Sequence, residues 1–170
     1  MTVIHAVPVG GGILAIAPLP GSDGDYAGDL EHIHGWAPAM VLSLTTLAEM
    51  VAVGAQDLGA HLHDKGTRWV HLPLEDFGAP DADFEERWPA VRDSAVRALM
   101  GGGRVLVHCR GGCGRSGMVA LRLMIEAGEA PDEALARLRG VRPCAVETDG
   151  QMDWAMAARR GAAVFLRHAH

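Results

Sequence analysis

Apolar and polar positions divide the first half of the chain into short apolar runs. Residues 3–8 and 13–18 are two such runs with glycines between them, which predicts a hairpin. Residues 39–44 and 69–74 read as buried strands. The clearest strand is 104–108, because glycines precede it and Val, Leu and Val form its centre.

Helical periodicity dominates the second half. Over residues 81–100 the apolar positions recur every three to four residues, and Pro89 must either kink that helix or begin a second one. Residues 115–127 are apolar almost all round, which predicts a central buried helix. Pro131 opens another helix, and a last helix is expected from about 151 to 167.

Strands that alternate with helices predict an α/β fold with a central, mostly parallel sheet flanked by helices on both faces. No repeat or low-complexity linker divides the sequence, so residues 1–170 are expected to form one domain. In such sheets ligands bind beyond the carboxyl ends of the strands. The turn from the 104–108 strand into the 115–127 helix is such a position.

Composition narrows the classes of function. The 170 residues are 49% apolar with a net charge of −6, which favours a compact globule and gives no general reason to bind nucleic acid or an anionic membrane. The three cysteines are few and odd in number, which argues against a disulfide framework and favours a reducing compartment. No signal peptide or spanning apolar stretch is visible, so a cytoplasmic location is expected.

The segment between the 104–108 strand and the 115–127 helix has the composition of an anion-binding loop. Gly111, Gly112 and Gly114 allow the backbone to curl so that successive N–H groups point inward, and the helix N-terminus adds its unpaired donors. Arg115 supplies a planar fork for two phosphoryl oxygens. Cys109 lies at the start of this loop.

The same surroundings predict a reactive cysteine. An ordinary thiol with a pKa near 8.5 is only about 3% ionised at pH 7. Helix N-termini and cationic neighbours lower cysteine pKa values to roughly 3.5–7.5. One constellation therefore explains both the binding of phosphate and the activation of Cys109 as a nucleophile.

The nine residues His-Cys-Arg-Gly-Gly-Cys-Gly-Arg-Ser at 108–116 resemble the signature of the protein tyrosine and dual-specificity phosphatases. The wider sequence looks most like the small cyclin-dependent-kinase-associated dual-specificity type. The resemblance covers roughly residues 60–155 and continues through the stretch 71–81. It implies a cysteine-dependent phosphatase of that fold, which hydrolyses phosphate monoesters in proteins or in small molecules and needs no cofactor or metal.

The resemblance also implies roles for individual residues. The Cys109 thiolate forms a phosphocysteine, and the loop residues bind the phosphoryl group, namely Arg110, Gly111, Gly112, Cys113, Gly114 and Arg115. Asp76 matches the family's general acid, and its place after the 69–74 strand independently puts it at the same sheet edge as Cys109. Asp81 is the alternative acid, and Glu75 a more distant one.

Five further residues receive interpretations from the same resemblance. Ser116 matches a hydroxyl that assists release of the cysteine sulfur, and Gln151 matches a glutamine that positions the hydrolytic water in some relatives. His108 is expected to order the loop rather than to titrate. Cys113 departs from the closest relatives; it is either a small apolar filler or a reversible disulfide partner of Cys109. Glu147 also departs from them, which weakens the case for a protein-kinase substrate.

Several alternatives remain. A rhodanese-like or arsenate-reductase-like enzyme also uses a cysteine in an anion loop, and a phosphate-binding module without catalysis is possible. Arg110 is the only additional basic residue in the loop, which favours a phosphopeptide or a small phosphate ester over a polyphosphorylated inositol. A monomer is favoured. Four histidines with spacing unsuited to zinc are interpreted as surface residues: His61, His63, His168 and His170.

Overall fold

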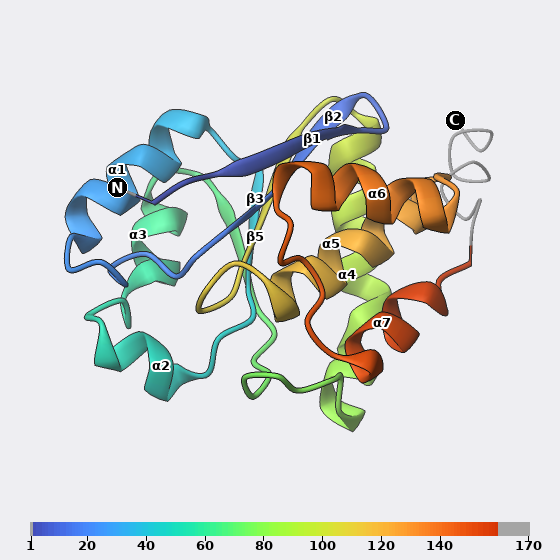
Figure 1. Ribbon diagram of the computed structural model, residues 1–170. Coiled ribbons are helices and arrows are strands. Elements are labelled where there is room, and N and C mark those ends of the chain that lie inside the picture. Colours follow the sequence, from blue (N-terminus) through green and yellow to red (C-terminus); the bar gives the residue numbers. More distant parts are fainter. Residues whose placement is uncertain (1, 160–170) are drawn as a thin grey trace.

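A five-stranded sheet forms the centre of the molecule (Figure 1). The structure is a computed structural model, and residues 2–159 are described. The strand order is β1-β2-β5-β3-β4, in which β1 is antiparallel to β2 and all other neighbours are parallel. Helices cover both faces of the sheet. The expected α/β fold with a mostly parallel sheet is thus confirmed.

The first two strands form the expected hairpin. β1 (His5–Val9) pairs with β2 (Gly12–Ala17), and the turn uses Gly10 and Gly11 at φ values of 63° and 107°. This left-handed backbone region favours glycine. The hairpin therefore ends in a tight turn, and β2 proceeds into the sheet beside β5.

β5 (Arg104–His108) is the middle strand, between β2 and β3 (Met40–Ser43). β4 (Arg68–His71) lies at the edge of the sheet beside β3 and ends earlier than the expected 69–74 run. The chain nevertheless stays extended beyond it, since the N–H groups of Leu72 and Leu74 donate to Ser43 and Leu44 at 2.9 and 3.0 Å. This extended path carries the following loop, residues 72–81, to the carboxyl edge of β5.

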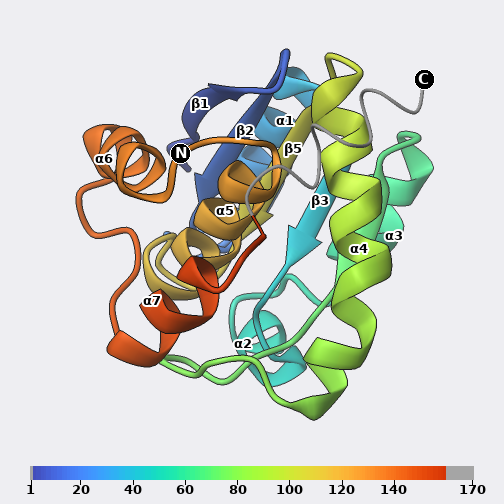
Figure 2. The same ribbon diagram turned by 90° about the vertical axis from the view of Figure 1, so that its right-hand side faces the viewer.

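The helices form two layers with separate cores (Figure 2). One layer holds four helices: α4 (Ala82–Met100), α5 (Gly114–Glu126), α6 (Pro131–Val141) and α7 (Asp149–Met156). The other layer holds α1 (Tyr26–Trp36) and α3 (Leu58–Asp64), while the short α2 (Leu47–Ala52) lies near the carboxyl edge of the sheet. The helices α1, α2 and α3 were not anticipated from the sequence.

α4 and α7 decide two open questions about helix boundaries. α4 is one continuous helix with Pro89 inside it, so Pro89 does not begin a second helix. Pro89 and Glu85, the residue whose carbonyl loses its donor, are both exposed, and water can satisfy that carbonyl. α7 ends at Met156, well short of the expected residue 167, and residues 160–167 lie outside the described part of the chain.

α5 is the buried central helix that its composition predicts. Twelve of its thirteen residues are buried, and Arg122 is the exception. The helix packs against β2, β5, α6 and α7. Its N-terminal turn is thereby fixed at the carboxyl end of β5.

Candidate active site

The loop between β5 and α5 is held tightly against its surroundings. We call residues 109–115 the Cys109 loop. Cys109 is only 2% exposed. Gly112 has a φ of 73°, and a Cβ at this position would approach Ala17 C and Pro18 N to 2.8 Å. Neither contact can relax without moving backbone, so the curl of the loop requires glycine here.

One hydroxyl group lies within hydrogen-bonding distance of the sulfur of Cys109. The Sγ atom lies 3.1 Å from Ser116 Oγ, which is fully buried in the first turn of α5. Ser116 can donate its hydroxyl hydrogen to the sulfur. Cys109 and Ser116, which the sequence analysis paired, are therefore in direct contact.

Arg115, the last residue of the Cys109 loop, is held in place by an ion pair that the sequence analysis missed. Its Nη1 and Nη2 atoms donate to Glu49 Oε1 and Oε2 at 2.7 and 2.8 Å, and Nη1 also donates to the Leu74 carbonyl at 2.8 Å. Arg115 is 1% exposed, and its buried Nε has no hydrogen-bond partner within the described chain. The Nη1–Nη2 end of the guanidinium is thus occupied, while the Nε–Nη2 edge keeps donors for another ligand.

Electrostatics reinforce this ion pair. Hydrogen bonds from Arg115, against the opposing effect of burial, lower the pKa of Glu49 to about 2. Burial by itself lowers the pKa of Arg115, but the hydrogen bonds with Glu49 and the charges of Cys109, Glu49 and Asp76 raise it above the ordinary value. Both partners therefore remain charged throughout the physiological range.

A local sequence signal for Glu49 exists. Thr46 caps α2 by accepting from the N–H of Glu49 at 3.2 Å, and Glu49 accepts from the N–H of Thr46 at 3.0 Å. Thr-x-x-Glu after a buried strand is the pattern of a capping box. That pattern predicts the start of a helix at the sheet edge, although it does not reveal that the carboxylate reaches Arg115.

His108 orders the strand end as a neutral imidazole. Its Nδ1–H donates to the Cys109 carbonyl at 3.3 Å, and its Nε2 lies 2.5 Å from Ser43 Oγ. Ser43 Oγ itself accepts from Trp69 Nε1 at 2.8 Å, so its hydrogen points to His108 and the imidazole accepts it. Complete burial lowers the pKa of His108 to about 4. These contacts hold the end of β5 in place next to Cys109.

The first two of the three candidate acids, Asp76 and Asp81, are in different positions. Asp76 Oδ1 lies 3.4 Å from Arg115 Nη2, accepts from the N–H of Phe77 at 3.0 Å, and remains 40% exposed at the mouth of the site. Asp81 is instead the N-cap of α4 and accepts from the N–H of Phe84 at 2.9 Å. Only Asp76 of this pair is in contact with the Cys109 loop.

Gln151 is fully buried and connects two loops. Its Oε1 accepts from the N–H groups of Glu147 and Thr148 at 2.9 and 3.2 Å as part of a capping box on α7, and its Nε2 donates to the Gly78 carbonyl at 3.3 Å. It therefore ties the start of α7 to the 72–81 loop. Glu147 and Gln151 lie against Gly114, whose absent side chain makes room for them.

The expectations for the cysteines were wrong. Cys113 forms a disulfide with Cys144, which leaves Cys109 as the free cysteine of the described chain. The partner comes from the α6–α7 loop, residues 142–148, whose other contacts explain the pairing. Arg142 donates to the Gly111 and Gly112 carbonyls at 2.9 and 3.1 Å, and the N–H of Val146 donates to the Cys113 carbonyl at 3.2 Å.

A metal site does not emerge from the described residues. No group of three or more histidine, cysteine, aspartate or glutamate side chains within residues 2–159 could hold a metal ion. His61 Nδ1 is 2.7 Å from Tyr26 Oη. His168 and His170 lie outside the described residues.

The fold and this site define a class of protein: an α/β domain with a buried cysteine and a buried arginine in the one loop that joins β5 to α5. The family model "Swiss Army Knife protein, DSP-PTPase phosphatase domain" matches residues 28–164. The chain therefore belongs to the dual-specificity and protein tyrosine phosphatase family, whose domains are cysteine-dependent phosphatases. The resemblance that the sequence suggested is confirmed.

Individual relatives agree with this assignment. The mouse protein Cyclin-dependent kinase inhibitor 3 is 33% identical over 140 residues, which cover 81% of this chain and 65% of the relative. Tyrosine-protein phosphatase CDC14 of Saccharomyces cerevisiae is 29% identical over 84 residues, 49% of this chain and 15% of the relative. The chain thus spans less than two thirds of the length of either.

Solved structures share the fold. Kinase associated phosphatase, with its catalytic cysteine replaced by serine, matches with a TM-score of 0.75 and 23% identity over 89% of this chain and 92% of the other. The active form of the phosphatase Tk-PTP matches with a TM-score of 0.65 and 27% identity over 84% of this chain and 88% of the other. In the described part of the chain no helix has the length and apolar character to cross a membrane.

Proposed function

We propose that this chain hydrolyses phosphate monoesters through a phosphocysteine at Cys109. The observation that carries the proposal is the arrangement of Cys109 Sγ, Ser116 Oγ at 3.1 Å and the unpartnered, buried Nε of Arg115 around one loop. A phosphoryl group in the Cys109 loop accepts from the loop N–H groups and from the Nε–Nη2 edge of Arg115. Glu49 holds the other end of the guanidinium, so the edge is aligned before the substrate binds.

The reaction uses two displacements at phosphorus. In the first, the Cys109 thiolate forms the S–P bond as the ester P–O bond breaks, and Asp76 protonates the leaving oxygen. In the second, water attacks phosphorus, its proton returns to the Asp76 carboxylate, and the S–P bond breaks to release inorganic phosphate. Ser116 donates a hydrogen bond to the departing thiolate. The Nε2 hydrogen of Gln151 that does not donate to the Gly78 carbonyl is proposed to position the water.

Phosphoproteins are the substrate class that the family supports, and this chain is proposed to act on phosphotyrosine, phosphoserine or phosphothreonine, or on a small phosphate ester. Residues 1–170 are proposed to act as one domain, monomeric and cytoplasmic. The Cys113–Cys144 disulfide removes the cysteine count as a reason for a reducing compartment, so the location rests on the other sequence features alone. The reaction needs no cofactor, because nucleophile, acid and anion-binding groups are all side chains or backbone of the chain.

Turnover of 4-nitrophenyl phosphate tests the proposal. The wild-type chain should release nitrophenol, vanadate should block the reaction, and Cys109→Ser should abolish it while retaining the circular dichroism spectrum of the parent. Full activity of Cys109→Ser would refute the mechanism. Transfer of sulfur from thiosulfate, reduction of arsenate, or tight phosphate-ester binding without turnover would instead support one of the alternative classes.

A further inference from the structure

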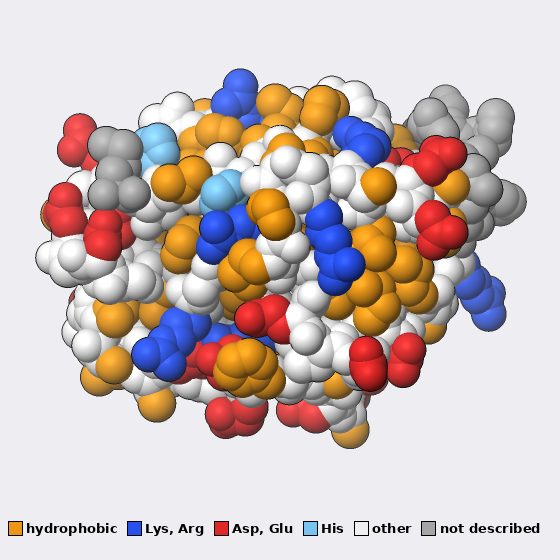
Figure 3. Space-filling model, in the orientation of Figure 1, with side chains coloured by type: hydrophobic (Ala, Val, Ile, Leu, Met, Phe, Trp, Pro, Cys, Tyr) orange, Lys and Arg blue, Asp and Glu red, His pale blue; other side chains and the backbone are white. Residues whose placement is uncertain are grey.

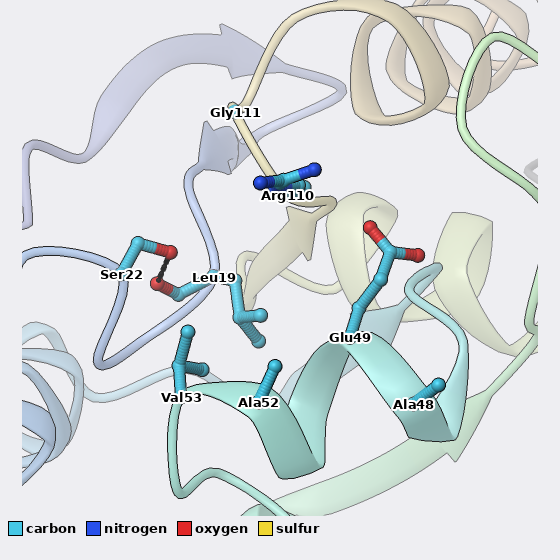
Figure 4. A pocket seen from close by; sticks show the side chains of 8 residues that line it. All are labelled: Leu19, Ser22, Ala48, Glu49, Ala52, Val53, Arg110 and Gly111. Atoms are coloured by element: carbon cyan, nitrogen blue, oxygen red, sulfur yellow. Dashed lines mark hydrogen bonds between the residues drawn. The ribbon is translucent and has the colours of Figure 1, made fainter.

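A cavity of about 530 Å³ opens beside the Cys109 loop (Figure 4). We call it the side pocket. Arg110 and Gly111 of the loop form one wall, and the opposite side is lined by residues of α2 and of the loop after β2: Leu19, Ser22, Ala48, Glu49, Ala52 and Val53. Figure 4 shows the side chains of Arg110 and Glu49 above the aliphatic side chains of Leu19, Ala52 and Val53.

The side pocket adjoins the phosphate-binding groups directly. Arg110 follows the nucleophile in the chain, and Glu49 is the residue whose carboxylate holds Arg115 at 2.7 Å. The N–H of Leu19 donates to the Arg110 carbonyl at 3.1 Å, which fixes the pocket wall to the Cys109 loop. A substrate whose phosphate lies in the loop can therefore extend its neighbouring atoms into this pocket.

The charges around the side pocket leave one cation uncompensated. The Glu49 carboxylate is neutralised by Arg115 through two hydrogen bonds. Within residues 2–159 no carboxylate or hydrogen-bond acceptor engages the Arg110 guanidinium, which is exposed above the cavity. The remaining lining is aliphatic, apart from Ser22, whose hydroxyl donates to the Leu19 carbonyl at 2.6 Å.

Exposed apolar side chains also lie on the elements that neighbour the site. Four large apolar side chains of the described chain are strongly exposed, and three of them lie on α2 or next to Asp76: Leu47 at 59%, Val51 at 55% and Phe77 at 61%. Figure 3 shows basic, acidic and apolar side chains side by side between α2 and the 72–81 loop. This surface suits a peptide better than a multiply charged headgroup, which would need more than one free cation.

We propose that the side pocket binds a residue adjacent to the phosphorylated residue of a peptide substrate, with an aliphatic side chain against Leu19, Ala52 and Val53 and a neighbouring carboxylate paired with Arg110. The proposal rests on the phosphatase function proposed above and specifies its substrate. An aliphatic side chain gains from leaving water for the pocket. The carboxylate gains from the free guanidinium, modestly because that guanidinium is exposed.

Matched phosphotyrosine peptides test the two halves of the proposal. One peptide has leucine and glutamate on both sides of the phosphotyrosine, and its partners replace leucine by serine or glutamate by lysine. The wild-type chain should prefer leucine over serine by about tenfold in kcat/KM, from the transfer of one aliphatic side chain. It should prefer glutamate over lysine by about threefold to fivefold.

Two variants assign these preferences to the side pocket. Ala52→Phe fills the cavity and should bring the leucine preference close to one, with 4-nitrophenyl phosphate turnover within about twofold of wild type. Ala60→Phe, the same change at an exposed position of α3 outside the pocket, should retain the preference. Arg110→Glu should reverse the charge preference, measured as a ratio within the variant so that any effect on the chemistry cancels.

Failure of this inference is distinguishable from failure of the proposed function. If 4-nitrophenyl phosphate and the peptides are hydrolysed but Ala52→Phe leaves the leucine preference intact, the side pocket does not bind the flanking residue. If Ala52→Phe loses activity only toward a phosphatidylinositol phosphate in micelles, the pocket binds a lipid headgroup and the proposal is overturned. If the wild-type chain hydrolyses nothing, the same ratios measured as Kd values for Cys109→Ser still decide the question.

Discussion

The Cys113–Cys144 disulfide should contribute a large share of the stability of the fold. The bridge closes a segment with a sequence separation of 31 residues. In the chain-entropy description, a loop of about 31 residues restricts the unfolded chain by about 3–4 kcal/mol at 25 °C. A typical domain unfolds with only about 5–15 kcal/mol. Removing the bridge should therefore shift the unfolding transition by an easily measured amount.

Guanidinium denaturation of the wild-type chain and of Cys113→Ser/Cys144→Ser measures this contribution. Without reductant, the double variant should be less stable by about 3–4 kcal/mol. With dithiothreitol the wild-type chain should lose about the same amount, while the double variant should not respond. This second comparison controls for the packing of the serine side chains.

The active site should survive loss of the bridge better than stability does. The α6–α7 loop also holds the Cys109 loop through Arg142, which donates to two carbonyls, and through the N–H of Val146. Turnover under native conditions should accordingly fall much less than the free energy of unfolding suggests. This account of the bridge would be refuted if the double variant lost less than about 1 kcal/mol of unfolding free energy. A Cys109–Cys113 linkage found by peptide mapping would refute it as well.

Three further predictions follow from the site. Arg115→Lys should reduce kcat/KM by at least about tenfold, because an ammonium cannot keep both the Glu49 pair and the phosphoryl contacts; a smaller loss contradicts the role of the Nε–Nη2 edge. Asp76→Asn should slow phenyl phosphate hydrolysis by about 10²-fold or more and 4-nitrophenyl phosphate much less. Asp81→Asn should leave both rates and the stability nearly unchanged, because an asparagine oxygen can still accept from the N–H of Phe84 and cap α4; the reverse pattern would make Asp81 the acid. Because the native pKa of His108 is about 4 and its ordinary value is 6.5, the unfolded chain binds the proton first as pH falls, so stability present above pH 6.5 declines toward pH 4. Between pH 7 and pH 4.5 the unfolding free energy of the wild-type chain should drop by about 2 kcal/mol more than that of His108→Gln. Equal drops in the two proteins would contradict the buried neutral imidazole.

The sequence predicted those elements whose signals are local. The β1–β2 hairpin has its glycines at the turn, β5 has its apolar triplet, and α5 is apolar on every side. α2 was missed because it has only six residues and shows no full period of an apolar face. α1 contains Gly28 and Gly35, and these weaken the helical pattern, because glycine is unfavourable in helix interiors.

The sequence predicted the part of the site that lies within one short segment of the chain, but not the contacts that distant residues make with it. Cys109 and Arg115 share one loop, so their spacing alone places them together. Glu49 and Cys144 reach that loop from sequence separations of 66 and 31 residues, and no local pattern specifies which distant carboxylate or thiol arrives there. Glu49 determines that the Nε–Nη2 edge of Arg115 is the one left unoccupied. The sequence alone therefore could not predict this edge either.

The burial of α5 separates two kinds of change that this protein can undergo. Arg115 and Ser116 belong to the helix that also fills the core, so a substitution that alters the chemistry also disturbs packing on several sides. The segments that surround Arg115 and Ser116 are α2, the 72–81 loop and the α6–α7 loop. Exposed positions on these segments can vary at little cost in stability. Single substitutions on these surrounding segments can accordingly change the substrate preference, whereas a change of reaction would require substitutions in the core.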